Sequence, residues 1–233
     1  MTTTSHALNA PKGARLRKTS ASQQIHDALR TRIINLELAP GEGLSRIEIA
    51  EYYGVSQTPV RDAMMRLEEE GLLVIFPQSK TEVSRIDLDH AKETQFLRLS
   101  LEIEVARQLV LAKDPALLTG AKIALTEQVA AQQAEDLSLF SAADRRFHRE
   151  LFEAANVSPL WDLVTERSGH IDRLRKLNLP DPGKVSDILA YHNRIIAAIA
   201  EGDLQKATNE IRGHLSGTLA SVETIRQRHP EYF

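Results

Sequence analysis

Four side chains able to bind a metal ion recur in the second half of the chain at spacings typical of helices. Asp144 and His148 are four residues apart, so a helix projects both side chains from one face. His192 and His214 each continue an apolar row of their own segment, which directs them toward the inside of a helical bundle. Three imidazoles and one carboxylate suit zinc, nickel, manganese or iron. We therefore expect a divalent metal at these four residues, with zinc first among the candidates.

A single histidine on an apolar face is more often a hydrogen-bonded core residue than a metal ligand. Four ligand-type groups on three helices of one bundle are harder to explain as unrelated buried residues, which favours a shared site. The chain contains no cysteine, so disulfides, thiolate ligands and cysteine nucleophiles are excluded. The other five histidines show no partner pattern and are expected to be solvated or structural: His6, His26, His90, His170 and His229.

The composition is that of a globular protein with room for two small domains. The 233 residues are 42% hydrophobic and 26% charged, and no apolar run reaches the roughly 18 residues of a membrane span. The first twenty residues lack the apolar stretch of a secretory signal, so we expect a cytoplasmic protein without membrane contact. Residues 1–21 hold four basic and no acidic side chains, and we expect a disordered basic tail there.

The residues that follow this tail predict two helices. Apolar residues recur every three or four positions from residue 25 to 36, and Pro40 stops that helix. A second helix opens at Ser45, which has the spacing of a capping box with Glu48, and it ends at Gly54.

A third helix and a hairpin complete this part of the chain. The helix starts after Ser56, which can cap it, and extends to about Glu70 before Gly71. Residues 72–76 and 81–83 have the apolar, β-branched character of two short strands joined by a turn. Helix, helix–turn–helix and hairpin are the layout of a winged helix, which we place at residues 22–85.

The chain after residue 86 predicts only helices. Breaks near Asp114, Asp136, Ser158, Pro180 and Gly202 divide it into six helical segments, and four of these segments show an apolar row. The row of the first segment consists of Phe96, Leu99, Ile103, Ala106 and Val110. The expected fold is therefore mainly α, a winged helix-turn-helix followed by an all-α six-helix bundle over residues 86–228.

The helix–turn–helix over residues 44–63 suggests DNA binding, because its second helix can enter the major groove while the first braces it. The exposed first turns of that second helix hold Gln57, Thr58 and Arg61, which suit adenine, phosphate and guanine contacts. Two amphipathic helices joined by a glycine turn also occur in proteins unrelated to DNA. Spacing alone leaves both possibilities open.

The residues themselves are more specific than their spacing. Pro40-Gly41-(x)2-Leu44 and Gly54-Val-Ser-x-Thr58-Pro-Val-Arg61-x-Ala63 closely resemble the DNA-binding domain of the GntR family of bacterial transcription regulators, over residues 22–83. The resemblance implies contacts with double-stranded operator DNA at Ser45, Arg46, Ser56, Gln57, Thr58, Arg61, Lys80 and Thr81. Two positions depart from the family: Gln57 stands where an Arg is usual, and Lys80 stands where a Gly usually precedes Thr81.

The second half resembles the FCD domain of the FadR-type branch of that family. The matching segments are Asp144-Arg-Arg-Phe-His148-Arg-Glu-Leu, Tyr191-His192-Asn-Arg and Ile211-Arg-Gly-His214-Leu. The resemblance implies a homodimer and a divalent metal at the floor of an effector cavity, and six helices point to the VanR-like subgroup.

Arg98 and Glu102 match an Arg-(x)3-Glu pattern of the same domain, and we expect them to bind the effector. Arg98 could clamp a carboxylate with two hydrogen bonds, so the expected effector is a small anionic metabolite, a carboxylate. The alternative for this pair is an ion pair on the helix surface.

Three functions are compatible with these residues. The favoured one is a ligand-responsive transcription regulator, a repressor without enzymatic activity. A metal-dependent hydrolase with a nucleic-acid-targeting domain is the alternative; it needs a general acid or base, for which Glu102 is the candidate, but no H-E-x-x-H motif occurs. A constitutive architectural DNA binder would have no use for the four ligand-type residues.

Two substitutions test the recognition helix. Arg61→Ala is expected to weaken operator binding by about 1–3 kcal/mol if the guanidinium contacts a base, and evenly across sequences if it contacts phosphate. Gln57→Arg is expected to shift base preference toward guanine, whose two acceptors Arg pairs with. Both are measured by binding titrations on an operator selected from random DNA and its point variants. Unchanged affinity in the first variant and unchanged preference in the second would together remove this helix from the DNA.

Overall fold

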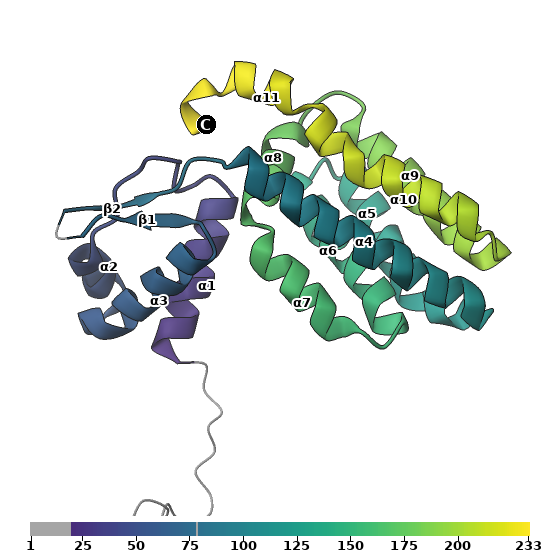
Figure 1. Ribbon diagram of the computed structural model, residues 1–233, viewed down its shortest axis with the longest axis horizontal. Helices are drawn as coiled ribbons and strands as arrows, with labels where there is room; N and C mark the ends of the chain where they lie inside the picture. Colours follow the sequence, from purple (N-terminus) through teal and green to yellow (C-terminus); the bar gives the residue numbers. More distant parts are fainter. Residues whose placement is uncertain (1–19, 78) are drawn as a thin grey trace, which may run out of the picture.

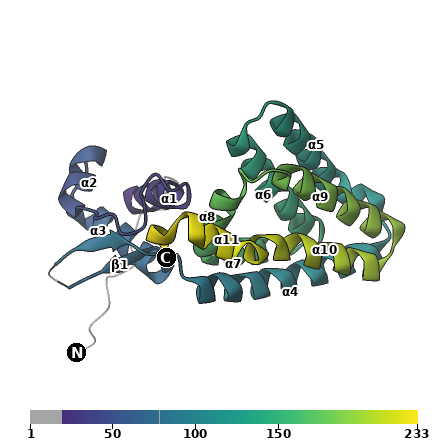
Figure 2. The ribbon, with the colours of Figure 1, turned by 90° about the horizontal axis from the view of Figure 1, so that it is seen from above.

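The computed structural model describes residues 20–77 and 79–233, so the expected tail lies, up to residue 19, outside the described residues. The chain forms two parts that lie side by side along its longest axis (Figure 1). The N-terminal part consists of three helices and a hairpin. The C-terminal part is a bundle of helices, and the C-terminal end returns to the junction between the two parts (Figure 2).

The N-terminal part has the winged-helix layout that the sequence predicts. Its elements are α1 (Ala21–Ile34), α2 (Arg46–Tyr53), α3 (Gln57–Glu69), β1 (Leu73–Ile75) and β2 (Thr81–Val83). Gly54 ends α2 with a φ of 64°, a left-handed conformation that glycine adopts without strain, and this makes the tight turn into α3. Ser45 caps α2 through the Glu48 amide, whereas Ser56 stands at the N-cap of α3 without a side-chain capping bond.

One apolar core holds these elements together. Ile25, Leu29 and Ile33 on the inner face of α1 are buried against Met64 and Leu67 of α3. The strands pair antiparallel, with Leu73 opposite Val83 and Ile75 opposite Thr81, which places Leu73 and Val83 in the same core. Helix α1 therefore serves as the support on which the recognition helix α3 rests.

The helical bundle begins at α4, and no separate linker segment precedes it. Its elements are α4 (Leu88–Ala112), a 3-10 turn η1 (Pro115–Leu118), α5 (Thr119–Gln133), α6 (Leu137–Ala154), α7 (Ser158–Arg167), α8 (Gly169–Asn178), α9 (Lys184–Glu201), α10 (Leu204–Ala220), α11 (Val222–Arg228) and a 3-10 turn η2 (Pro230–Tyr232). All six predicted segments are present, but two of them are divided, at Ser168 and at Ser221. At Ser168 the hydroxyl bonds to the Thr165 carbonyl at 2.8 Å and to the Asp172 carboxylate, a local competition that interrupts the helix.

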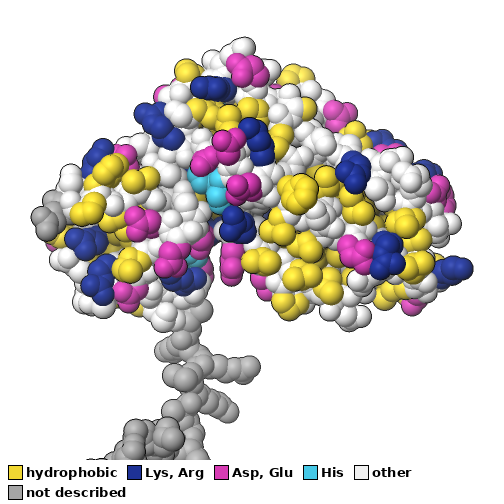
Figure 3. Space-filling view, in the orientation of Figure 1, with side chains coloured by type: hydrophobic (Ala, Val, Ile, Leu, Met, Phe, Trp, Pro, Cys, Tyr) yellow, Lys and Arg dark blue, Asp and Glu magenta, His cyan; other side chains and the backbone are white. Residues whose placement is uncertain are grey.

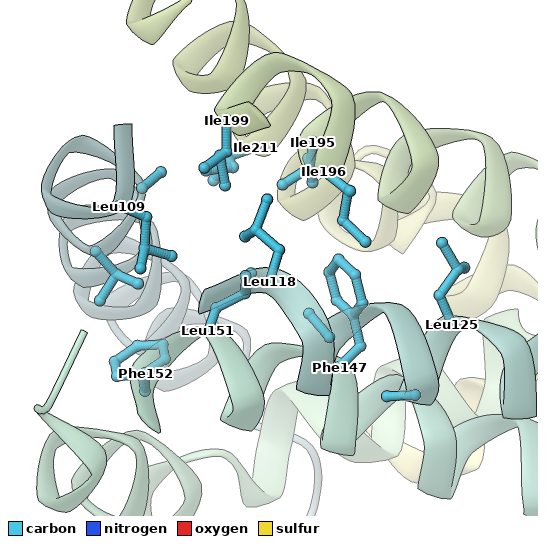
Figure 4. Close-up of a cluster of buried hydrophobic side chains, with 14 of the residues drawn as sticks. Leu109, Leu118, Leu125, Phe147, Leu151, Phe152, Ile195, Ile196, Ile199 and Ile211 are labelled. Atoms are coloured by element: carbon cyan, nitrogen blue, oxygen red, sulfur yellow. The ribbon is translucent and has the colours of Figure 1, made fainter. Parts of the chain in front are cut away.

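The inner faces of these helices enclose a second core. Phe147, Leu151, Ile195, Ile199 and Ile211 lie within it (Figure 4). Among the described residues, no helix has both the length and the apolar content needed to cross a bilayer.

The apolar row predicted for residues 96–110 is wrong at its first member, because Phe96 is 74% exposed. The buried face of α4 passes instead through Thr94, Arg98 and Glu102 before it reaches Val105. Polar residues at these inner positions hid the true face of the helix from a hydrophobic pattern.

A completely buried arginine joins the two parts. Arg173 of α8 donates to the Ser84 carbonyl at 2.6 Å, and its Nη2 lies 3.0 Å from His170 Nδ1. The same His170 nitrogen accepts the amide of Asp87 at 2.9 Å. Burial lowers the pKa of Arg173 to about 10, and burial together with the Arg173 charge lowers the pKa of His170 to about 3. At neutral pH the guanidinium is charged and the imidazole is neutral.

The chain after α10 also contacts this junction. The Ile86 amide donates to the Tyr232 carbonyl at 2.8 Å, and the Arg85 guanidinium donates to the Glu231 carbonyl at 2.6 Å. Ile86 packs in a small apolar cluster with Ile171 and Ile225. The segment between the winged helix and α4 is therefore enclosed by α8 on one side and by the C-terminal residues on another.

Close packing between Gly169 and Leu72 makes this junction testable. A Cβ on Gly169 would lie 2.5 Å from Leu72 Cδ2, so Gly169→Ala is expected to lower the free energy of unfolding by about 1–3 kcal/mol. In the double variant with Leu72→Ala the clash is absent, and the combined loss should be smaller than the sum of the two single losses.

Denaturant unfolding of the single and double variants measures this coupling. Gly43→Ala is the matched control, because a Cβ there meets no atom within 4 Å. Losses that simply add would show that Gly169 and Leu72 are not in contact.

Candidate metal centre and effector cavity

The four predicted metal ligands converge from three helices. Asp144 and His148 lie one turn apart on α6, His192 on α9 and His214 on α10, and one ligand atom of each lies within 4.8 Å of the others. The Nε2 atom of His214 is 3.1 Å from Nε2 of His148 and 3.2 Å from Nε2 of His192. The Oδ1 atom of Asp144 is 3.5 Å from Nε2 of His192. The structure therefore brings together the four residues that the sequence singled out.

A carboxylate behind His148 fixes which nitrogen of that ring faces the cluster. Glu102 Oε2 lies 2.9 Å from His148 Nδ1, and a carboxylate accepts hydrogen bonds, so the assigned tautomer carries its proton on Nδ1. Nε2 of the neutral ring then presents a lone pair to the cluster. In many proteins a carboxylate that accepts from the far nitrogen of a metal-binding histidine orients the ring in this way.

Gln128 of α5 does the same for His192 and was missed by sequence reasoning. Its Nε2 donates to Asp144 Oδ1 at 3.3 Å, which leaves Oε1 to accept from His192 Nδ1 at 2.8 Å. The Gln128 side chain is fully buried, and the Phe147 ring stacks on the His192 ring with 3.9 Å between centroids. The sequence did contain a signal for this residue. Gln128 is a glutamine among alanines on the inner face of a helix that is predicted to pack in the bundle.

The donor set fits a divalent cation. Two Nε2 lone pairs, from His148 and His192, point toward the Nε2 of His214. The single proton that His214 can place on this atom satisfies only one of them, so the other lone pair lacks a donor from His214 unless a cation lies among the three nitrogens. Two nitrogens bound to one zinc ion at about 2.0–2.1 Å are roughly 3.3 Å apart in a tetrahedral site. The observed separations of 3.1 and 3.2 Å match that spacing.

The electrostatics also favour ligation. Burial, with smaller contributions from neighbouring His148 and Arg98, lowers the pKa of His192 well below its usual value, and enclosure in the bundle does the same for His214. Both rings are therefore neutral at pH 7, the form that binds metal. Burial alone would raise the pKa of Glu102, but the Arg98 charge and the interactions with His148 lower it to about 2.

Arg98 and Glu102, expected to bind the effector, form an ion pair that is buried and not on the helix surface. Arg98 Nε lies 2.5 Å from Glu102 Oε1, and the two side chains are 4% and 3% exposed. The other Glu102 oxygen is the one that faces His148. Arg98 lines the cavity described next, whereas Glu102 is not among its lining residues, so Glu102 lies one layer behind it.

A cavity of about 270 Å³ opens beside the cluster. Asp144 and His214 line it, while His148 and His192 lie fully buried beneath them. Its charged lining is predominantly basic and comprises Arg98, Arg145, Arg175, Lys176, Lys184, Asp144 and Asp172. An anion small enough to enter would therefore find both the cluster and a positive field.

The same cavity is lined by the winged-helix part. Thr31 and Ile34 from the last turn of α1, and Asn35 directly after it, belong to its wall. A molecule in the cavity therefore contacts the support of the recognition helix as well as the bundle.

The residues predicted to contact DNA are mostly exposed. Gln57 and Thr58 open α3, Arg61 follows one turn later, Arg46 opens α2 and Lys80 precedes β2; all five side chains are exposed. The remaining three are Ser45 and Thr81, which are half-buried, and the exposed Ser56.

Two of the exposed cations have acidic neighbours. Lys80 Nζ lies 2.5 Å from a carboxylate oxygen of Glu82, and Arg61 lies 3.7 Å from Asp62. A phosphate or base contact would replace these exposed ion pairs, which contribute little on their own.

Comparisons with known proteins find relatives over nearly the whole chain. Residues 21–83 match the bacterial regulatory proteins of the gntR family, and residues 93–217 match the FCD domain. An HTH-type transcriptional regulator of Streptomyces ambofaciens is 35% identical over 91% of this chain and 89% of its own length. The HTH-type transcriptional repressor RspR of Escherichia coli K12 is 29% identical over 91% of this chain and 93% of its own. The structure of E. coli McbR/YncC has the same fold, with a TM-score of 0.74 at 20% identity over 91% of this chain and 100% of that one.

The role of Gln128 can be tested with all four residues of the His–Asp cluster left in place. Gln128→Leu removes the acceptor that orients His192 and is expected to weaken zinc binding about 10–100-fold, measured by competition with a chelator. The matched control is Gln132→Leu, one turn further along α5, where the amide contacts Ser186 and not the cluster. Equal zinc affinity in both variants would show that Gln128 does not support a metal ligand.

Proposed function

We propose that this chain is a repressor controlled by a small anionic metabolite. The premise is that it belongs to the GntR family of bacterial regulatory proteins and carries an FCD domain. Its relatives are transcriptional regulators and not enzymes, so the chain is a DNA-binding transcription regulator. The hydrolase alternative finds no support among them. The metabolite, a carboxylate, would bind beside a divalent metal held by Asp144, His148, His192 and His214.

One observation carries this proposal: a single cavity is lined both by the His–Asp cluster and by α1 of the winged helix. A ligand there has differential contacts available to it, because any movement of α1 relative to the bundle changes the cavity wall. Differential contacts are what a ligand needs to shift a conformational equilibrium. Thr31, Ile34 and Asn35 provide them on the DNA-binding side.

The chain's own residues would receive the anion as follows. A metal held by the cluster would supply an electrophilic centre for a carboxylate oxygen. Arg98 is held in place by Glu102 and offers its remaining N–H groups to the same anion. His148 and His192, fixed by Glu102 and Gln128, would keep the metal position rigid.

Occupancy would be transmitted through α1. This helix packs on α3 and is joined to α7 by Arg30, whose Nη2 lies 2.5 Å from the Thr165 carbonyl and whose Nε donates to Glu70 at 2.8 Å. A ligand that draws α1 toward the bundle, or pushes it away, would therefore change the position of α3 and its presentation of Gln57, Thr58 and Arg61 to the groove.

We further propose a homodimer that binds a near-palindromic operator in the cytoplasm. One recognition helix reads only a few base pairs, so specificity requires two copies. Apolar side chains gather on the face that Figure 3 shows over α4 and α7. Each of these two helices carries an exposed large apolar side chain, Phe96 on α4 at 74% and Leu163 on α7 at 44%. Such a patch on a DNA-binding protein is suited to pairing with a second copy.

The deciding experiment removes one ligand from the cavity side of the cluster. His214→Ala is expected to lose bound metal and effector-dependent DNA release while it keeps operator binding. In the wild-type protein, metal at a hundredfold excess over its Kd should add about 2.7 kcal/mol to stability. Because burial lowers the pKa of His192 and of His214 well below the usual value of about 6.5, this gain should persist below pH 6.5 and be lost only when the pH falls far enough to protonate the folded imidazoles.

Elemental analysis, thermal unfolding and operator titrations with the co-purified ligand, identified by native mass spectrometry, measure these effects. His229→Ala, outside the cluster, is the matched control. Normal metal content and an intact effector response in His214→Ala would show that the histidines of the cluster are only core residues.

A further inference from the structure

We propose that Asn178 is a second anchor for the effector and selects acids that carry another acceptor oxygen away from the carboxylate. This inference rests on the proposed function, because it assigns the chemistry of the ligand that the cavity takes. Asn178 ends α8, a helix that contributes no metal ligand. It was not among the residues that the sequence singled out.

The observation behind the proposal is an unpaired buried donor. Asn178 is 2% exposed, and its Nδ2 has no hydrogen-bond acceptor among the described residues. The same residue lines the cavity beside the His–Asp cluster. Buried polar groups in folded proteins are nearly always paired, because an unpaired one loses its hydration without compensation. A donor left unpaired in a ligand cavity therefore indicates a group that the ligand satisfies.

The backbone around Asn178 holds this donor in place. The Leu179 amide donates to the Arg175 carbonyl at 2.9 Å, and the Asn178 carbonyl accepts the Asp181 amide at 3.1 Å. Leu179 is itself buried in the bundle core, which anchors the end of the helix. The backbone of Asn178 is therefore held in place at the end of α8.

The surroundings define the class of ligand. Lys176 and Lys184 line the cavity near in sequence to Asn178, and Asn35 of the winged helix lines it as well. These groups supply hydrogen-bond donors, so an oxygen that accepts is the complement they require. With a carboxylate at Arg98 and the cluster, the effector is an acid with a second carboxylate, carbonyl or hydroxyl oxygen.

A simple aliphatic acid would leave Asn178 unpaired. Sites built to hydrogen-bond a ligand group discriminate strongly against analogues that lack it, because their own buried groups then remain unsatisfied. Asn178 therefore accounts for specificity, while the metal cluster and Arg98 account for binding of the carboxylate common to all acids. Since α8 also packs against α1, the second anchor adjoins the helix that supports α3.

The first test needs no ligand. Asn178→Leu replaces the unpaired amide with an apolar group of similar size, so the melting temperature of the ligand-free full-length protein is expected to rise by about 2–4 °C. Asn193→Leu is the matched control, because the Asn193 amide donates to the Leu189 carbonyl on the exposed side of α9 and should give no such rise. An unchanged or lower melting temperature for Asn178→Leu would show that its amide is already paired, which overturns the proposal.

The second test uses defined acids as probes. Succinate, glutarate and adipate are titrated calorimetrically into zinc-loaded wild-type and Asn178→Leu protein, against butyrate, pentanoate and hexanoate of matched length. The wild-type protein is expected to prefer the dicarboxylate of at least one pair. Asn178→Leu should weaken that dicarboxylate at least tenfold and change the matched monocarboxylate by less than twofold.

The outcomes separate this inference from the proposed function. An equal loss for both acids, or none for either, would show that Asn178 does not read a second oxygen and would leave the metal-bound effector intact. Failure of every acid to bind the wild-type protein would overturn the carboxylate effector itself, and this inference with it. His214→Ala should weaken all the acids that bind, which identifies the cavity as their common site.

Discussion

The bundle depends on the requirement that polar groups buried among apolar side chains be paired. Five helices each direct at least one polar residue to the same interior point: Arg98 and Glu102 from α4, Gln128 from α5, Asp144 and His148 from α6, His192 from α9 and His214 from α10. An unpaired buried charge or imidazole would destabilise the fold by several kcal/mol. Each helix is therefore held in one register by hydrogen bonds as well as by packing. The Nε2 atoms of His148, His192 and His214 meet within this network, where a divalent cation would pair them.

Much of this arrangement could be predicted from the residues. The winged helix follows from local signals, because Gly54 ends α2, Ser45 caps it and the strands are short and β-branched. The four residues of the His–Asp cluster could be selected from helical periodicity, since a helix places Asp144 and His148 on one face whatever surrounds them. Features decided by contacts distant in sequence could not be predicted. Gln128 gains its role only when α5 lies beside α6 and α9, and a pattern search has no reason to select a glutamine.

The helix boundaries and the inner face of α4 show the same limit. Thr94, Arg98 and Glu102 are polar, so a search for apolar periodicity placed Phe96 inside, although it is 74% exposed. The division at Ser168 arises because its hydroxyl competes for the Thr165 carbonyl, and the tight approach of Leu72 then demands Gly169. The requirement for glycine at position 169 is visible only when the winged helix is packed against α8. Tertiary contacts of this kind override local helix propensity.

The shared cavity wall has a consequence for how such a regulator can diverge. Thr31, Ile34 and Asn35 touch whatever occupies the cavity, and they belong to the segment whose other face carries the winged-helix core. A substitution there alters both the ligand preference and the position of the recognition helix, so selection cannot change one of these properties without the other. Changes on α8 and α9 are free of that linkage. New ligand specificities should therefore arise on the bundle side of the cavity, while the α1 side changes only when the response to the ligand changes with it.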